Sequence, residues 1–137
     1  MARWLLKSEP FKYSWERMVA DGTTHWDGVR NHQASNNLKA MKLGDRAFFY
    51  HSNEGLAVVG VVEIAREYYP DPSDEAGRFG MVDVRALLPV KTPVTLKAMK
   101  ADPLLQNMAL VRQSRLSVCP VTDAEWAHVC ALAGIEA

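Results

Sequence analysis

The middle of the chain reads Arg46-Ala47-Phe48-Phe49-Tyr50-His51-Ser52-Asn53-Glu54-Gly55-Leu56-Ala57-Val58-Val59-Gly60-Val61-Val62-Glu63-Ile64. Its first six residues are rich in aromatic side chains and residues 56–64 are rich in valine, which is typical of buried strands. The polar residues between them, Ser52-Asn53-Glu54-Gly55, favour a hairpin turn. The segment therefore predicts two antiparallel neighbours at the centre of a sheet.

Weaker patterns on both sides of this hairpin predict further elements. Alternating apolar and polar residues predict strands over 3–7 and 81–90, and a last short strand over 115–118. The strand pattern that begins at Leu56 fades at Tyr68-Tyr69-Pro70-Asp71-Pro72. Residues 71–80 are rich in Pro, Asp, Ser and Gly, which is typical of an exposed loop.

Capping residues and apolar spacing predict several short helices. Ser14 is placed to cap a helix that ends near Asp21-Gly22. Ala34, Leu38 and Met41 fall on one face of a helix from about Asn31 to Lys42. Further helices are expected from Pro93 and Thr95 to about Lys100, from Asp102-Pro103, and from Thr122, which forms a capping box with Glu125.

These elements indicate an α+β fold with five or six strands and short helices. Regular alternation of strands and helices is absent, and no Gly-x-Gly-x-x-Gly turn occurs, so a doubly wound nucleotide-binding sheet is excluded. A small mixed barrel fits the order of elements better. The length of 137 residues fits one domain spanning 1–137.

Composition excludes some classes of partner. The chain carries sixteen acidic and sixteen basic residues, and this balance argues against tight coating of nucleic acid driven by charge alone. Its basic residues are concentrated in residues 28–53 and 97–118, which would form one local patch if they met in the fold. No apolar run approaches the roughly 20 residues of a membrane span, and the N-terminus does not resemble a signal peptide, so a cytoplasmic protein without membrane contact is expected.

The sequence predicts neither a metal nor another cofactor. Cys119 and Cys130 form no Cys-x-x-Cys pair, and the four histidines show no His-x-x-x-His spacing.

The segment Trp26 to Asn37 is the first candidate for a binding site. It places an aromatic ring, a tight turn and Arg30 in front of a helix rich in amides. Trp26 offers a face for stacking a base, and Asn and Gln side chains can both donate to and accept from a polar heterocycle. A surface loop, a capped helix and a buried Trp explain the same residues, and the segment alone does not decide between the two interpretations.

Further polar and aromatic blocks occur at expected strand ends, and together they match a known family. The chain resembles the EVE domain, a relative of the PUA and YTH domains, and in particular the thymocyte nuclear protein family. The resemblance covers about Trp4 to Trp126. It is carried by Trp4-Leu5-Leu6-Lys7-Ser8-Glu9-Pro10, Trp26-Asp27-Gly28-Val29-Arg30-Asn31 with Gln33-Ala34 and Asn36-Asn37-Leu38, Met41-Lys42-x-Gly44-Asp45, Phe48-Phe49-Tyr50-His51-Ser52, Tyr69-Pro70-Asp71-Pro72, Pro93-Val94-Thr95-Leu96, and Leu110-Val111-Arg112-Gln113-x-Arg115-Leu116-Ser117-Val118.

The resemblance implies a PUA-like pseudo-barrel of five to six strands surrounded by short helices. It also implies a pocket for a modified base, such as a methylated or hydroxymethylated cytosine, in DNA or RNA. The residues that it places in this non-catalytic site are Trp26 and Tyr50, with Ser8, Asn31, Ser52, Gln113 and His51 nearby, and Arg30, Arg112 and Lys7 for phosphate or ligand oxygens. His32 stands where the family often has Tyr, and Ser114 where it often has Gly.

Two other functions remain open at this level. Among PUA-like relatives, some ASCH domains resemble small amidohydrolases or ribonucleases, and Glu9, Lys7 and His51 would form an acid–base cluster if strand ends bring them together. Alternatively, the segment Tyr68-Tyr69-Pro70-Asp71-Pro72 would serve a protein-interaction module.

Overall fold

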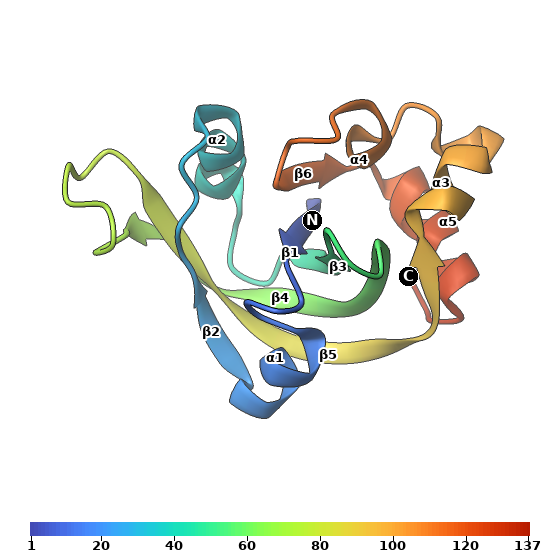
Figure 1. Cartoon of the computed structure of the whole chain (residues 1–137), viewed down its shortest axis with the longest axis horizontal. Coiled ribbons are helices and arrows are strands. Elements are labelled where there is room, and N and C mark those ends of the chain that lie inside the picture. The colour runs from blue at the N-terminus through green and yellow to red at the C-terminus, as the bar shows by residue number, and fades with distance from the viewer.

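The computed structural model describes all 137 residues and is built on one six-stranded mixed sheet in the order β2-β5-β4-β3-β1-β6 (Figure 1). The strands are β1 (Arg3–Ser8), β2 (Thr23–Trp26), β3 (Arg46–His51), β4 (Ala57–Pro70), β5 (Gly80–Thr95) and β6 (Val118–Val121). The helices are α1 (Trp15–Asp21), α2 (His32–Ala40), α3 (Leu96–Ala101), the 3-10 turn η1 (Pro103–Leu105), α4 (Ala109–Arg112) and α5 (Asp123–Ala133). The α+β fold with short helices is confirmed.

The central hairpin predicted from the aromatic and valine-rich segments is confirmed as β3 and β4. The two strands are antiparallel, with Phe48 opposite Val61, and the register shifts between Phe49 and Tyr50. The turn holds Asn53 and Gly55 at φ values of 65° and 79°, a left-handed conformation that Asn and Gly adopt more readily than other residues.

The first strand lies inside the sheet and brings two distant parts of the chain together. β1 runs parallel to β3, with Lys7 opposite Tyr50 and Ser8 opposite His51. On its other side it pairs antiparallel with β6, with Leu6 opposite Val118. Because β1 and β3 are parallel, both strands end at the same edge of the sheet. The polar residues that follow them therefore lie side by side.

Three strand predictions needed correction. Residues 23–26 form the edge strand β2, where no strand was predicted. Four residues with one buried side chain are too short a pattern to recognise in the sequence. The last strand spans Val118–Val121 instead of 115–118, because Leu116 N–H donates to the Gln113 carbonyl in a turn that delays its start. The strand β4 runs on to Pro70 because irregularities between Ile64 and Tyr69 let its pairing with β5 continue past the loss of alternation. At the other end of the pair, a register shift between Val58 and Gly60 lets β5 continue to Thr95, opposite Ala57.

The predicted helix starts are confirmed by their caps, except that Pro93, expected to open a helix with Thr95, lies in β5, and α3 begins only after Thr95. Ser14 accepts from Arg17 N–H, Thr95 accepts from Ala98 N–H, and Thr122 with Glu125 forms the complete capping box. Asn31 caps α2, which ends one residue before Met41. Met41 is still buried, so the expected apolar face is present on a shorter helix.

The core lies between the sheet and its helices. Phe48 stacks on Trp126 of α5 with ring centroids 3.9 Å apart, and Trp15 of α1 packs edge-on against Phe49 at 5.3 Å. Gly60 leaves the space that the Trp15 ring fills, since a Cβ at this position would lie 2.5 Å from that ring. No helix is both long and apolar enough to cross a bilayer.

Candidate functional site

The common edge where β1 and β3 end opens into a polar cleft of about 550 Å³, here called the Trp26 cleft. It lies between the end of β1, the start of α1 and the edge strand β2, and its walls carry both charges and aromatic rings. Its lining residues are Lys7, Ser8, Glu9, Lys12, Tyr13, Arg17, Thr24, His25, Trp26 and Asp27.

Trp26 forms a wall of this cleft and is also part of the core. Its side chain is 9% exposed, and its ring meets Phe49 edge-on with centroids 5.6 Å apart. The structure thus shows the buried Trp that the sequence analysis gave as one interpretation, and it places that residue on the border of the cleft.

Tyr13 supplies a second aromatic side chain that the sequence reasoning missed. The Ser8 hydroxyl donates to the Tyr13 carbonyl over 2.6 Å, and the Tyr13 hydroxyl donates to Asp21 over 2.8 Å. Burial raises the pKa of Tyr13, so its hydroxyl stays protonated at neutral pH. Tyr13 belongs to no motif that indicates binding. Its position shortly after Ser8, at the end of a predicted strand, was the one sequence feature that could have placed it near the site.

Lys7 joins the Trp26 cleft to a second cavity. Its ammonium group donates to the Ser114 carbonyl over 2.8 Å, and burial lowers the pKa of Lys7. This second cavity, here called the Tyr50 cavity, has a volume of about 350 Å³. Its lining residues are Lys7, Glu9, Tyr50, Ser52, Asn53, Leu56, Leu96, Lys100, Leu110, Ser114, Arg115 and Ser117.

Tyr50 and Ser52, both expected in the site, therefore lie next to the Trp26 cleft and outside it. Tyr50 is 2% exposed, and burial raises its pKa to about 12. Its hydroxyl is consequently protonated at any physiological pH and is a hydrogen-bond donor. Lys7 and Glu9 border both spaces.

His51 does not join an acid–base cluster. Its Nε2 accepts a hydrogen bond from the Trp15 backbone N–H over 3.0 Å, which fixes α1 against the end of β3. Burial lowers the pKa of His51, although Glu16 opposes the shift, and an accepting Nε2 requires the neutral ring. Lys7 and Glu9 line the cavities, and His51 lines neither. The three residues predicted for hydrolysis do not share one space.

Asn31, Arg112 and Gln113 form a separate hollow of about 370 Å³ between α2 and α4. Gln33 Nε2 donates to Gln113 Oε1 over 2.9 Å, which ties the two helices together. Asn31 Oδ1 accepts from Ala34 N–H as the cap of α2. Arg112 donates to the Gln106 carbonyl over 2.8 Å. The hollow touches the Tyr50 cavity through Ser114 and Arg115.

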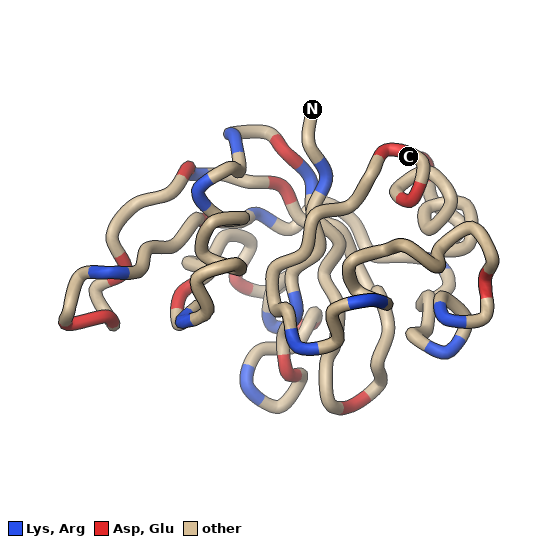
Figure 2. The backbone as a smooth tube through the Cα atoms, turned by 90° about the horizontal axis from the view of Figure 1, so that it is seen from above, with Lys and Arg blue, Asp and Glu red and all other residues tan.

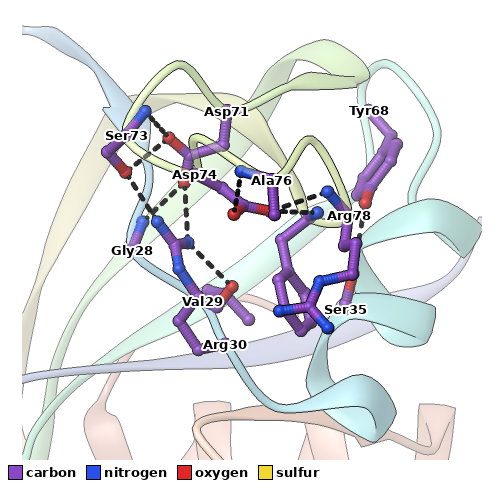
Figure 3. A network of polar contacts seen from close by, with 11 residues as sticks. Gly28, Val29, Arg30, Ser35, Tyr68, Asp71, Ser73, Asp74, Ala76 and Arg78 are labelled. Carbon is purple, nitrogen blue, oxygen red and sulfur yellow. Dashed lines mark hydrogen bonds and ion pairs between the residues drawn. The ribbon is translucent and has the colours of Figure 1, made fainter.

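Arg30 lines none of these spaces and lies in a polar network with the β4–β5 loop (Figure 3). Its guanidinium donates to Asp71 and Ser73 over 3.2 and 3.0 Å. Asp71 is 2% exposed and also accepts from Gly28 N–H over 2.9 Å and from Ser73 N–H over 2.8 Å. The network holds the turn after Trp26 in place. Arg30 thus stabilises the turn that follows Trp26, a residue of the cleft lining.

Desolvation of Asp71 would raise its pKa, but the hydrogen bonds to its carboxylate outweigh that effect and hold the pKa at about 2. The carboxylate is therefore charged at neutral pH, and it serves as a fixed acceptor for backbone donors of both loops.

The charges on the molecule are mixed. Lys and Arg occur along its whole length among Asp and Glu (Figure 2). Of the basic residues in 28–53, Arg30 pairs with Asp71 and Lys39 lies over the Tyr68 ring. Lys100 and Arg115, from the second basic segment, instead meet Lys7 in the Tyr50 cavity. The structure gathers no group of three or more His, Cys, Asp or Glu side chains that could hold a metal.

The fold and the site together define a PUA-like domain. They combine a six-stranded mixed sheet, a parallel β1–β3 pair, short helices and a polar cleft where that pair ends. The fold is shared even at low identity: the YTH domain of Zygosaccharomyces rouxii MRB1 superposes with a TM-score of 0.61 at 15% identity, over 96% of this chain and 86% of that one.

The chain belongs to the EVE domain family, whose family model matches residues 2–132. Thymocyte nuclear protein 1 of Gallus gallus is 39% identical over 94% of this chain and 67% of its own length. A crystal structure from Agrobacterium tumefaciens is 51% identical with a TM-score of 0.97, covering 98% of this chain and 94% of that one. Human THYN1, solved in complex with 5-methylcytosine-containing DNA, is 37% identical with a TM-score of 0.90 over the full length of both chains.

Proposed function

We propose that the protein is a non-catalytic reader that receives one modified base of DNA or RNA in the Trp26 cleft. The observation that carries this proposal is the cleft itself, because a rigid aromatic wall and polar groups of both kinds converge on one space. Its volume of about 550 Å³ lies within the roughly 300–1,000 Å³ typical of small-molecule sites. Membership in a family that includes human THYN1, solved with 5-methylcytosine-containing DNA, supports the same conclusion.

The polar groups in the cleft suit a nucleobase with an exocyclic amino group. The carboxylates of Glu9 and Asp27 line the cleft and can accept from such an amino group, as acidic side chains do from cytosine N4. Lys7 also lines the cleft and can donate to a ring carbonyl. Trp26 and Tyr13, the aromatic residues of the lining, can contact the faces of the base. The cleft thus offers hydrogen bonds along one edge and apolar contact on the flat sides.

The energetics set an expectation for specificity. Extruding a base from a duplex costs a few kcal/mol, and each base–aromatic contact returns roughly 1–3 kcal/mol. Burial of a single added methyl group contributes about 0.8 kcal/mol, or about fourfold in affinity. We therefore expect modest discrimination by methylation and tighter binding of single strands than of duplexes, since a single strand avoids unpairing.

Labelled oligonucleotides that differ only in one cytosine modification provide the test, read out by fluorescence anisotropy. We expect saturable binding that is tightest for one modified form. Glu9→Gln should weaken it about five- to tenfold, because an amide lacks the charge of the acceptor. Glu54→Gln is the matched control, since Glu54 is an exposed residue of the hairpin turn and lines none of the cavities described above.

Circular dichroism of each variant checks that the fold is intact. Equal affinity for all modified and unmodified forms, in both DNA and RNA, would contradict base reading. Unchanged binding by folded Glu9→Gln would remove the proposed edge recognition from this cleft.

A further inference from the structure

The Trp26 cleft is the first part of a longer furrow. Lys7 and Glu9 border both this cleft and the Tyr50 cavity. The Tyr50 cavity in turn shares Asn53, Leu56, Leu96 and Lys100 with a third depression of about 520 Å³. This depression, here called the α3 groove, lies between the hairpin turn and the start of α3 and also includes Gly55, Thr95 and Lys97. Each of the three spaces therefore adjoins the next through residues that line both.

The part of the furrow beyond the Trp26 cleft is strongly basic. Lys7, Lys97, Lys100 and Arg115 line it, and Glu9 is its one acidic residue. The whole chain has a formal net charge of zero, so this concentration is local. Lys97, Lys100 and Arg115 are exposed and take part in none of the ion pairs of the structure. Their charges remain available to an anionic ligand.

The walls of the α3 groove are rigid. Leu96 N–H donates to the Leu56 carbonyl over 2.8 Å, which fixes the start of α3 against the hairpin. Thr95 caps the helix through Ala98 N–H over 3.1 Å, and Met99 is fully buried beneath it. Lys97 and Lys100 are three residues apart on this anchored helix and therefore neighbours on its surface.

Apolar side chains also line the furrow. Leu56 is 41% exposed on the hairpin side, and Leu96 lies opposite it in the same groove. A row of cations alongside exposed apolar side chains suits a strand that carries both phosphates and unpaired bases, as in other single-strand grooves. Isolated phosphate ions would use the charges but not the leucines.

We propose that the Tyr50 cavity and the α3 groove bind the sugar–phosphate backbone of the strand whose modified base occupies the Trp26 cleft. Phosphates flanking that base then lie against Arg115, Lys100 and Lys97. This inference rests on the proposed function, because the base in the cleft sets where the strand enters. It assigns the protein a footprint of several nucleotides of single strand.

The test uses the double variant Lys100→Ala/Arg115→Ala and the control Lys42→Ala, an exposed lysine that lines none of these spaces. Ligands are a free modified nucleoside, a single-stranded series of increasing length with one modified base, and inorganic phosphate as competitor. We expect wild type to bind longer strands progressively tighter. The double variant should lose this gain, with about a tenfold or greater drop for the longest strand at low salt.

Salt dependence separates phosphate contacts from general destabilisation. Loss of two phosphate contacts should reduce the slope of log affinity against log salt by about 1.4 for a single strand. Binding of the free nucleoside should be the same in wild type and variant, which shows that the base cleft is intact. Lys42→Ala should behave as wild type in every arm.

Modification-dependent binding with an unchanged salt slope and length series in the double variant would overturn the backbone path while leaving base reading in place. Competition by inorganic phosphate as effective as that by the unmodified strand would also overturn it, because the site would then hold a lone anion. Conversely, a changed slope on strands that show no modification dependence would support the path and count against base reading.

Discussion

Replacement of Asp71 by asparagine removes one buried charge from the network that holds the turn after Trp26 (Figure 3). Asp71 accepts from Gly28 N–H on one loop and from Ser73 N–H on its own, and it pairs with Arg30. An asparagine of the same shape keeps one acceptor and turns the other into a donor that faces existing donors. We expect the turn to loosen and the Trp26 wall to lose its support.

The pKa of Asp71 gives the size of the effect. The hydrogen bonds hold that pKa at about 2 against an ordinary value of 3.8, so the ionised form is favoured in the folded state by about 2.5 kcal/mol. The Arg30 side chain is 40% exposed, so its ion pair supplies only a small part of this, about 0–1 kcal/mol. Most of the stabilisation comes from the backbone and hydroxyl donors.

The depressed pKa fixes the sign of the pH dependence. Stability from the Asp71 carboxylate is fully present above its unfolded pKa of 3.8 and is lost as the pH falls through the folded value of about 2. Urea unfolding should therefore show wild type more stable than Asp71→Asn by about 2.5 kcal/mol at neutral pH, and by about half of that at pH 3.

Asp74→Asn is the matched control, because Asp74 accepts from Arg78 and Phe79 N–H within the same loop and is not the acceptor of the Gly28 and Arg30 hydrogen bonds, which go to Asp71. Binding of a modified oligonucleotide should weaken in Asp71→Asn more than in the control. A difference in unfolding free energy that stays constant between neutral pH and pH 3 would refute this reasoning, as would Asp71→Asn being as stable as wild type.

Two further predictions concern the core. Trp4→Phe should lower the free energy of unfolding, measured by urea titration, by about 1–3 kcal/mol. The indole N–H donates to buried Asp45 over 3.1 Å, and phenylalanine leaves that carboxylate without this donor. A variant as stable as wild type would contradict the prediction. Gly60→Ala should lower the free energy of unfolding, measured by thermal denaturation, by about 1–3 kcal/mol, because the new Cβ would lie 2.5 Å from the Trp15 ring. An unchanged unfolding midpoint would contradict this and show that α1 shifts freely to make room.

The local parts of the fold were predictable because their causes are local. Thr122 and Glu125 form their capping box within four residues, and the 46–64 hairpin carries its own turn. The strand Thr23–Trp26 was missed because its composition does not mark it as a strand. It is defined by its pairing with β5, in which Trp26 lies opposite Val82. The bulges that extend β4 to Pro70 are likewise products of pairing.

The candidate site divides in the same way. Lys7, Ser8 and Trp26 line one cleft, whereas Tyr50 and Ser52, which the resemblance placed with Trp26, line the cavity beside it. Arg30 appeared free to meet a ligand because its partner, Asp71, is forty-one residues away and on another loop. Side chains that depend on long-range ion pairs cannot be assigned from their own segment.

The position of β1 between β3 and β6 has a consequence for how the protein is made. The ribosome releases Lys7 and Ser8 early, yet Leu6 pairs with Val118 and Lys7 N–H donates to the Ser117 carbonyl. In the nascent chain β1 can pair with β3 once residues 46–51 have emerged, but its other side remains unpaired until the C-terminal strand has emerged. Contacts this distant in sequence are slow to form, so the wall of the Tyr50 cavity that Ser114, Arg115 and Ser117 supply is completed in one of the last steps of folding. A chain stalled or truncated before Val118 would expose the open side of an apolar strand, which is a natural target for chaperones and proteases.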